Sequence, residues 1–352
     1  MTRLRVLVVD DSSTARNWLC EVVAADPALE LVAAADDGKA AIERCTELRP
    51  DVVAMDMMMP VMTGVAATEY IMAYCPTPIL IVSSSTNRGE LFRTYDALAA
   101  GAVDVLEKPR GDEPEGSWEA RFLSTLKLVA RIRVITHLRG RQSSRVGPRP
   151  PPAPISPSPH VEVLGIGAST GGPGAILEIL RHLPPRLPIP VLFVLHLSER
   201  FGGAFAEWLD GQTAHEVRFA RDGEPVAATA GRIVMAPPDR HLLVRDGRLR
   251  VTDDAERHSC RPSVDVLFES LARGYGNGAA ACLLTGMGRD GAAGMLAVRN
   301  AGGATIAQDE ATCVVFGMPR EAIALGAAVH VHPIYEIGPA LVALMSDRRG
   351  QR

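Results

Sequence analysis

A proline-rich stretch near the middle of the chain constrains its folding more than any other feature. Residues 137–160 read HLRGRQSSRVGPRPPPAPISPSPH, which is rich in proline, serine and arginine and almost free of apolar residues. Proline removes backbone donors and such a composition cannot bury a core, so we predict a semi-extended linker. The prolines, Pro150, Pro151 and Pro152 among them, are also compatible with a polyproline ligand. The chain is therefore expected to fold as separate units on either side.

The linker sets the expected domain limits. A chain of 352 residues is long enough for about two domains, each with its own core. We expect a first domain over residues 1–125, a helix end and linker over 126–159, and a second domain over 160–347. Residues 118–134 carry apolar side chains at helical spacing, and this helix is expected to close the first domain.

Both domains alternate short apolar runs with helical patterns, which is typical of parallel α/β sheets. In the first domain we expect strands over residues 5–9, 31–34, 52–55, 79–82 and 103–106, and helices over 14–24, 40–48, 65–73 and 91–99. In the second we expect strands over 161–166, 191–195, 281–284 and 304–307, with a hairpin in IVMAPPDRHLLVRDGRLRV. The predicted fold class is α/β, with two doubly wound parallel-sheet domains.

Composition excludes several functional classes. A formal net charge of -4 and the lack of a basic domain after the linker argue against nucleic acid as the partner. No apolar run approaches the roughly 20 residues of a membrane helix, and the N-terminus does not match a signal peptide. Six cysteines lie far apart with no CxxC pair, which indicates reduced thiols in a cytoplasmic protein that does not insert into membranes. They are Cys20, Cys45, Cys75, Cys260, Cys282 and Cys313.

Three carboxylates follow predicted strands of the first domain, where open parallel sheets bind their ligands. Asp10 and Asp11 follow the first strand, and Asp56 follows the third. Their charges repel one another, and a hard cation with oxygen ligands, Mg²⁺, would relieve that repulsion. Such a metal would also let a carboxylate attack a phosphoryl group by neutralising its oxygens.

Two further polar residues end strands at the same edge. Ser83 ends the fourth predicted strand with a hydroxyl, and Lys108 follows the fifth with an ammonium. Taken singly, Asp10 and Asp11 are also compatible with capping the next helix, and Lys108 with a solvated surface charge. All five residues, each at a strand end, favour one phospho-acceptor site.

Residues 1–125 resemble the response-regulator receiver family in VLVVDDSS, DVVAMDMMMPVMTG, IVSSS and GAVDVLEKP. The resemblance implies a flavodoxin-like fold in which Asp56 accepts phosphate from a histidine kinase. It further implies that Asp10, Asp11 and Asp56 hold Mg²⁺, with Ser83 as switch hydroxyl and Lys108 contacting the phosphate. Two positions depart from the family pattern. Thr63 stands where aspartate is usual and Val105 where an aromatic switch residue is usual, which puts an aromatic-flip mechanism in doubt.

A second group of polar residues lies in the second domain. Residues 167–171, GASTG, form a G-x-S-x-G motif at a predicted strand-to-helix turn, which would expose the hydroxyl of Ser169. Serine needs a base, and an acid to orient that base. His196 follows the next predicted strand, and Asp290 precedes another helix after the strand over 281–284. All three are expected at one edge of one sheet, which favours a serine hydrolase.

Other interpretations of these residues stay open. Ser169 and Asp290 are each compatible with capping the helix that follows, and His196 with a structural role. The glycine-rich turn is also compatible with a dinucleotide fold, although Thr170 stands where that fingerprint needs glycine and His196 where it needs an acid. The alternative functions are a receiver-regulated nucleotide-binding oxidoreductase and a non-catalytic scaffold.

Residues 161–345 resemble the catalytic domain of the chemotaxis protein-glutamate methylesterases. The motifs are GIGASTGGP, APPDRH, RPSVDVLF, LTGMGRDGAAG and IAQDEATCVVFGMPREAI, in family-like order. The resemblance implies a Rossmann-like domain without a cofactor, in which Ser169 is the nucleophile, His196 the general base and Asp290 its orienting acid. Backbone amides near Thr170 and Met287 would face the oxyanion.

The resemblance also implies a biological role. A phosphorylation-activated esterase of this kind would hydrolyse glutamyl methyl esters on methyl-accepting chemoreceptors and deamidate receptor glutamines, within a chemotaxis-type two-component system. One departure concerns the residues beside the catalytic histidine. Leu195 and Leu197 stand where the family often has glutamine and methionine, a change that affects the pocket wall more than the chemistry.

Overall fold

The computed structural model describes residues 3–84, 87–109, 114–132, 134, 161–197 and 199–346. Contacts divide the chain into two compact units, Met1–Gly147 and Pro148–Arg352. The predicted linker, with its polyproline alternative, lies outside the described residues. No helix in the described ranges combines the length and hydrophobicity of a membrane span.

The first unit is a five-stranded parallel sheet with the order β2-β1-β3-β4-β5. Its strands are β1 (Leu4–Val9), β2 (Leu29–Ala35), β3 (Val52–Met55), β4 (Ile79–Ser83) and β5 (Asp104–Glu107). Its helices are α1 (Ser13–Ala25), α2 (Gly38–Leu48), α3 (Gly64–Tyr74), α4 (Arg88–Ala99) and α5 (Ser117–Val129). This strand order is that of the flavodoxin-like folds, as expected.

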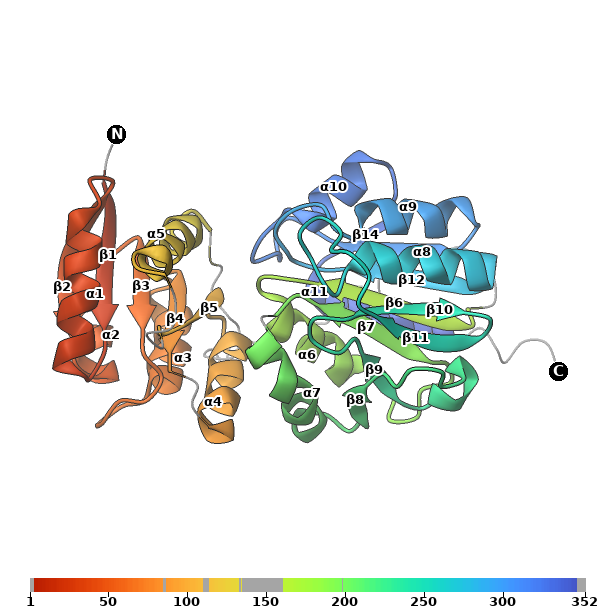
Figure 1. The fold of residues 1–352 in the computed structure, drawn as a ribbon, viewed down its shortest axis with the longest axis horizontal. Helices are drawn as coiled ribbons and strands as arrows, with labels where there is room; N and C mark the ends of the chain where they lie inside the picture. Colours follow the sequence, from red (N-terminus) through yellow and green to blue (C-terminus); the bar gives the residue numbers. More distant parts are fainter. Residues whose placement is uncertain are drawn as a thin grey trace, which may run out of the picture. The chain divides into compact units, whose positions relative to one another are not determined.

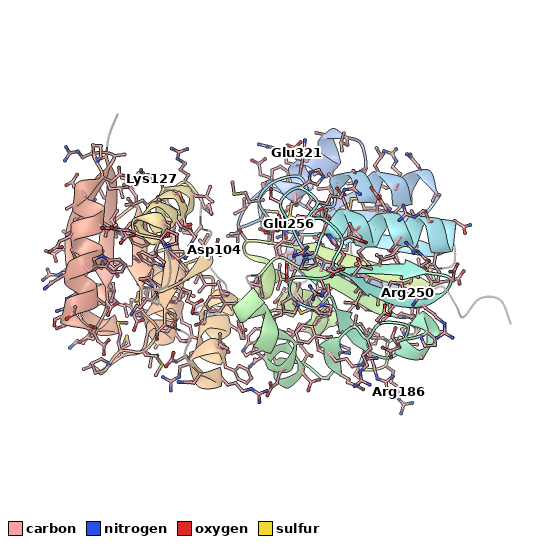
Figure 2. All side chains as sticks on the ribbon, in the orientation of Figure 1. Asp104, Lys127, Arg186, Arg250, Glu256 and Glu321 are labelled. Atoms are coloured by element: carbon pink, nitrogen blue, oxygen red, sulfur yellow. The ribbon has the colours of Figure 1, made fainter. Side chains whose placement is uncertain are left out.

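Side-chain caps explain why four of these helices begin where they do. The side chains of Ser12, Asp37, Thr63 and Asn87 each accept a hydrogen bond from a backbone amide in the first turn of α1, α2, α3 or α4. Helix α5 is bound to the end of α1, because Lys127 forms an ion pair with Asp26. Figure 2 labels Lys127 on α5. This helix ends at Val129, five residues before its predicted end.

The second unit is a seven-stranded parallel sheet with the order β14-β13-β12-β6-β7-β9-β8 (Figure 1). Its strands are β6 (Val163–Ala168), β7 (Val191–Leu195), β8 (Val217–Phe219), β9 (Ile233–Met235), β12 (Ala279–Leu283), β13 (Ala304–Gln308) and β14 (His330–His332). From β6 the chain adds β7, then the edge strand β8, and then β9 between β7 and β8. It next crosses to β12, on the other side of β6, and builds through β13 to β14 at the opposite edge. The boundary between β6 and β12 is therefore the topological switch point, where doubly wound sheets bind ligands.

Helices cover both faces of this sheet. They are α6 (Gly172–His182), α7 (Glu199–Gln212), α8 (Val264–Tyr275), α9 (Ala292–Asn300), α10 (Met318–Ala324) and α11 (Ile334–Ser346). Figure 1 shows α8 and α9 on one side and α6 and α7 on the other. Buried side chains such as Leu192, Phe268 and Met295 fill the core between β7, α8 and α9. The two parallel-sheet α/β domains confirm the predicted fold class.

The predicted hairpin is shorter than expected. Its arms are β10 (His241–Arg245) and β11 (Arg248–Thr252), which pair antiparallel as a separate two-stranded sheet. The first residues of the predicted hairpin instead form β9, which pairs in parallel with β7 and β8 in the main sheet. Prolines 237 and 238 separate the two because proline cannot continue a strand ladder.

Candidate active site and phospho-acceptor site

Ser169 lies in the turn between β6 and α6, at the switch point of the second sheet. Its amide donates to Thr285 O at 3.0 Å, and its carbonyl accepts from Gly172 N at 2.7 Å. Gly171 is the N-cap residue of α6, and no side chain accepts a hydrogen bond from the first turn of this helix as a cap. Ser169 therefore does not cap the helix that follows it, and its hydroxyl makes no hydrogen bond within the described ranges.

Glycines make this turn possible. A Cβ on Gly167 would lie 2.2 Å from Val264 Cγ1, so only glycine lets β6 pack this closely against α8. Gly171 has φ 78°, a left-handed conformation that residues with a Cβ rarely adopt. The G-x-S-x-G spacing thus has two physical causes, close packing at its first glycine and backbone conformation at its second.

His196 leaves the neighbouring strand at the level of Ser169. Ala168 and Leu195 are paired in the parallel register of β6 and β7, and His196 N donates to Ala168 O at 3.1 Å. The imidazole Nε2 lies 2.9 Å from Asp290 Oδ2. Because an ionised carboxylate only accepts, it holds the proton on Nε2 and leaves Nδ1 as the nitrogen available to a serine hydroxyl.

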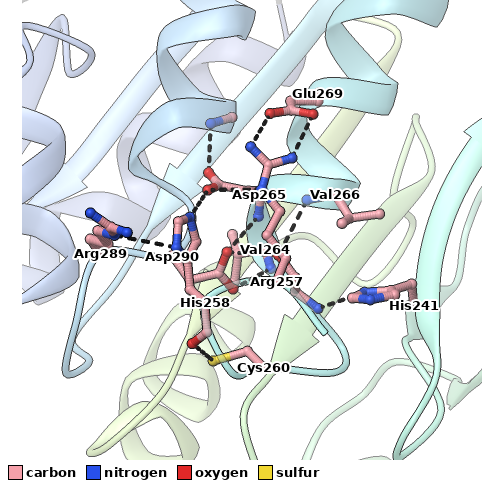
Figure 3. Close-up of polar contacts among 12 residues, drawn as sticks. His241, Arg257, His258, Cys260, Val264, Asp265, Val266, Glu269, Arg289 and Asp290 are labelled. Atoms are coloured by element: carbon pink, nitrogen blue, oxygen red, sulfur yellow. Dashed lines mark hydrogen bonds and ion pairs between the residues drawn. The ribbon is translucent and has the colours of Figure 1, made fainter. Parts of the chain in front are cut away.

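Asp290 lies in the loop after β12 and is 2% exposed. Its two oxygens accept from Val264 N at 2.7 Å and Asp265 N at 3.1 Å, residues labelled in Figure 3. They also accept from Ser263 Oγ at 2.7 Å and from the His196 imidazole. The amides belong to the first turn of α8, whose N-terminus favours a negative charge. Asp290 therefore does not cap α9, which begins after Gly291 without a side-chain cap.

The imidazole and the carboxylate shift each other's pKa values. Burial lowers the pKa of His196, but the hydrogen bond that its Nε2 donates to Asp290 and the nearby Cys260 outweigh burial and raise that pKa to about 9. Burial by itself would raise the pKa of Asp290. The bonds from His196, Ser263 and Asp265 outweigh burial, so the Asp290 pKa is lower than usual. A charged pair at neutral pH follows.

Two backbone amides in the segments next to Ser169 have no partner within the described residues. Thr170 N and Met287 N donate no hydrogen bond within the described part of the chain. The loop that carries Met287 lies against the serine, because a Cβ on Gly286 would be 2.7 Å from Ser169 Cβ. A surface pocket of about 740 Å³ opens beside this loop and is lined by Met287, Gly288, Phe316 and Arg320, among others.

Several residues that support this site are not predicted from the sequence. Thr285 Oγ1 donates to Thr170 O at 3.0 Å, and Gln308 Oε1 accepts from Thr285 N at 2.8 Å, so both hold the turn in place. Ser263 holds Asp290, as described above. Cys260 Sγ lies 3.8 Å from His196 Nδ1. These residues belong to the quoted motifs or lie beside them, and no spacing rule assigns them a role.

The first sheet brings its predicted residues together as well. Lys108 Nζ lies 2.8 Å from Asp10 Oδ2 and 2.9 Å from Asp56 Oδ1, so this lysine is paired rather than solvated. Ser12, not Asp10 or Asp11, caps α1, and Asp10 Oδ1 accepts from Ser12 N at 3.0 Å. Burial raises the pKa of Asp56, with the Lys108 ammonium opposing that rise.

Oxygen atoms of three carboxylates converge in this pocket. One oxygen each of Asp10, Asp11 and Asp56 lie within 4.8 Å of one another. This donor set is all oxygen and carries excess negative charge, which fits Mg²⁺ and suits neither zinc nor copper. Asp10 and Asp56 are buried and Asp11 is exposed, so one side of the pocket is open to solvent.

Three further residues of the first domain named in the sequence analysis are Ser83, Thr63 and Val105. Ser83 is buried at the end of β4, and its carbonyl accepts from Lys108 N at 2.9 Å. Thr63, which stands where the receiver family has aspartate, caps α3 by accepting from Ala66 N. Val105 lies in β5, half-buried, and pairs with Ile81 in the register of the sheet.

Known proteins share both halves of the chain. The family model described as response regulator receiver domain matches residues 6–114, and the one described as CheB methylesterase matches residues 164–341. The solved catalytic domain of CheB methylesterase from Thermotoga maritima is 37% identical with a TM-score of 0.50. The match covers 52% of this chain and 98% of that domain.

Relatives also match over the full length. The protein-glutamate methylesterase/protein-glutamine glutaminase 2 of Anaeromyxobacter dehalogenans is 45% identical over 96% of this chain and 96% of its own. A relative of the same name in Pseudomonas aeruginosa is 44% identical over 99% of this chain and 98% of its own. The chain belongs to the protein-glutamate methylesterase/protein-glutamine glutaminase family, with a receiver domain followed by a CheB methylesterase domain.

Proposed function

We propose that this chain hydrolyses glutamyl methyl esters on a protein, with Ser169 as nucleophile, His196 as general base and Asp290 as its orienting acid. The observation that carries the proposal is the 2.9 Å contact between His196 Nε2 and Asp290 Oδ2. His196 follows the strand next to that of Ser169, whose hydroxyl makes no hydrogen bond with the residues that the structure describes. All three residues follow adjacent strands at the switch point of one sheet.

The proposed reaction begins when Ser169 Oγ attacks the ester carbonyl. His196 Nδ1 takes the hydroxyl proton, since Nε2 is held by Asp290. The amides of Thr170 and Met287 donate to the carbonyl oxygen as it becomes negative. Methanol leaves with the proton from His196, and a glutamyl-enzyme ester remains. Water then attacks that ester as His196 takes a proton from it, and His196 returns the proton to Ser169 Oγ. The glutamyl side chain of the substrate leaves as a carboxylate and Ser169 is restored.

Glutamine deamidation uses the same steps. A glutamine side chain is almost isosteric with the methyl ester, and ammonia leaves in place of methanol. The pocket beside Met287 and Arg320 would hold the neighbouring part of the substrate. By family, the proposed substrates are methyl-accepting chemoreceptors, and the proposed place of action is the cytoplasm.

The pH dependence of hydrolysis tests the role of His196. A general base must be neutral, and the pKa of His196 is raised to about 9. We therefore expect kcat/KM to rise with pH across the neutral range and level off near pH 9, above the usual histidine value of about 6.5. The measurement is methanol release from methylated receptor membranes at a series of pH values. A profile that is flat from pH 6 to pH 10 would contradict this role.

The receiver domain is proposed to control the esterase by phosphorylation of Asp56. Asp10, Asp11 and Asp56 would hold Mg²⁺, which neutralises phosphoryl oxygens during transfer when bound. The Asp56 carboxylate accepts the phosphoryl group from a histidine kinase or a small phosphodonor. Lys108 then exchanges its contact with the free carboxylate for one with the phosphoryl group, and Ser83 supplies a hydroxyl.

An Asp56→Asn variant tests this control. The amide cannot accept a phosphoryl group, so a phosphodonor such as acetyl phosphate is expected to raise methanol release by the wild type and leave the variant unchanged. Asp96→Asn serves as the control, because this carboxylate lies in α4 outside the pocket. Equal activation of the wild type and Asp56→Asn would exclude Asp56 as the acceptor.

A single assay separates the proposed function from its alternative. Methanol release from methylated receptor membranes, with and without phosphodonor, is expected only of an esterase, and a fluorophosphonate should label Ser169. A nucleotide-binding oxidoreductase would instead be stabilised by NAD. The structure disfavours that alternative, because His196 stands where the dinucleotide fold needs an acidic residue and is bound to Asp290.

A further inference from the structure

We propose that Cys260 and His196 form an inhibitory Zn²⁺ site at the catalytic base. Cys260 lies in the loop between β11 and α8, and its Sγ lies 3.8 Å from His196 Nδ1. Nδ1 is the nitrogen that the proposed mechanism assigns to the Ser169 proton. The inhibition by Zn²⁺ rests on that proposed function, whereas binding of the ion does not.

The spacing of the two atoms fits a single zinc ion. Tetrahedral zinc binds sulfur at about 2.3 Å and imidazole nitrogen at about 2.0–2.1 Å, which places the two ligand atoms about 3.6 Å apart. The observed 3.8 Å is close to that value, so both side chains can bind one ion with little movement. Thiolate and imidazole are also the ligand types that select zinc over magnesium or calcium.

Asp290 occupies the position of a supporting carboxylate. It accepts from His196 Nε2, the nitrogen opposite the one that would bind the ion. Histidine ligands of zinc usually donate their second N–H to a carboxylate in this way, which orients the ring and raises its basicity. One Asp290 oxygen, one nitrogen of His196 and the Cys260 sulfur all lie within 4.8 Å of one another.

The loop holds Cys260 in place. Arg257 and Cys260 exchange two backbone hydrogen bonds, of 3.1 Å and 3.0 Å. Arg257 is itself fixed by two bonds to Glu269 on α8, of 2.8 Å and 2.6 Å (Figure 3). The thiol is half-buried, so an ion from solvent can reach it.

A neighbouring group of possible ligands does not compete. His258, Asp265 and Asp290 also lie close together, but each polar atom there has a partner. Asp265 accepts from His258 at 3.1 Å and from Gly294 N at 2.6 Å, and Arg289 Nε lies 3.2 Å from the other His258 nitrogen. Two arginines, Arg257 and Arg289, add positive charge to that group and oppose a cation.

Bound zinc would block hydrolysis directly. An ion on Nδ1 occupies the lone pair that must take the serine proton. Water or a substrate oxygen would fill the remaining positions of the ion. The ion is held by two side chains of the protein, so we expect a reversible site that a chelator empties.

Cobalt tests binding without any assay of hydrolysis. Reduced full-length protein in excess Mg²⁺, which fills the receiver pocket, is titrated with Co²⁺ alone, and the near-ultraviolet thiolate-to-cobalt absorption is recorded. We expect the band in the wild type and in Cys20→Ser, whose thiol is the other half-buried one, and its loss in Cys260→Ser. Displacement of the band by Zn²⁺ shows a shared site. No band in the wild type, or a band that survives in Cys260→Ser, overturns the proposal.

Inhibition of hydrolysis is the second readout. Each variant is compared with its own rate without metal, so a slower variant does not confuse the result. We expect Zn²⁺ to inhibit the wild type and Cys20→Ser, and the half-inhibiting concentration to rise at least about tenfold in Cys260→Ser. If the wild type shows the cobalt band but releases no methanol, the metal site is supported and the proposed esterase function is rejected. If it releases methanol but shows no band, the esterase function is supported and the metal site is rejected.

Discussion

Ser169→Ala is expected to abolish methanol release from methylated receptors while the protein stays folded. Removal of the nucleophile leaves the base and the oxyanion donors with no group to activate, and we expect a loss of at least about 10³-fold in kcat. Stability should change little, because the Ser169 hydroxyl makes no hydrogen bond within the described ranges. Labelling by a fluorophosphonate should disappear in the same variant.

Substitution of a second serine serves as the control, because it is expected to lower stability and leave methanol release in place. Ser270 is buried in α8, where its hydroxyl accepts from Val244 N at 2.9 Å and donates to Leu267 O at 2.7 Å. Ser270→Ala leaves a buried donor without a partner, which costs about 1–3 kcal/mol of stability. We expect this variant to unfold more easily and still release methanol. Turnover by Ser169→Ala at the wild-type rate would end the proposal that serine is the nucleophile.

Strand ends account for the part of the site that sequence could predict. In a parallel sheet every strand carries its next residue to the same edge, so a polar residue after an apolar run is placed by position alone. Ser169 and His196 directly follow β6 and β7 in this way, as Asp10 and Asp56 follow β1 and β3. The positions of these four residues needed only the approximate strand ends, whereas Asp290 follows β12 after a loop and is placed only to the same edge.

The supporting residues could not be placed by the same argument. Cys260 and Ser263 reach His196 and Asp290 from a loop that connects the hairpin to α8, and the path of that loop depends on tertiary packing. Local pattern does not encode such a path. The same limit applies to β8 and β14, since a strand of three residues has too few positions for alternation to be read.

The structure excludes the capping roles that residue chemistry alone allows for Ser169 and Asp290. Asp290 precedes a helix and is therefore compatible with an N-cap, a role that sequence alone cannot exclude. The structure shows that Asp290 instead accepts hydrogen bonds from the first turn of α8. Val264 in that turn precedes Asp290 by 26 residues in the chain. Only the packing of α8 against β12 and α9 brings that helix end to Asp290, and long-range packing of this kind has no signature in the sequence.

Asp290→Asn is expected to damage both catalysis and local stability. An amide presents its NH₂ group to donors that need an acceptor, and it no longer stabilises the imidazolium. By the effect of the same change in serine proteases, we expect kcat to fall by on the order of 10³–10⁴-fold. Breaking a buried ion pair costs about 3–5 kcal/mol of stability, so the unfolding temperature of the catalytic domain should also fall.

The pH dependence of that stability loss follows from the two pKa shifts. The Asp290 pKa is lowered, so its contribution is present above the usual carboxyl value of about 3.9 and is lost as pH falls through the lower folded value. The His196 pKa is raised, so its contribution is complete below about 6.5 and is lost as pH rises toward about 9. The difference in the free energy of unfolding between the wild type and Asp290→Asn should therefore be largest between about pH 4 and pH 6.5.

Hydrogen exchange gives a local measurement of the same effect. Val264 N and Asp265 N donate to Asp290, so their amides should exchange faster in Asp290→Asn than in the wild type. Asp239→Asn removes the same charge from a half-buried pair with Arg261, outside the contacts of Asp290. This control should change neither exchange at α8 nor methanol release by more than about twofold. Unchanged exchange and turnover in Asp290→Asn would show that the carboxylate neither holds the start of α8 nor orients the base.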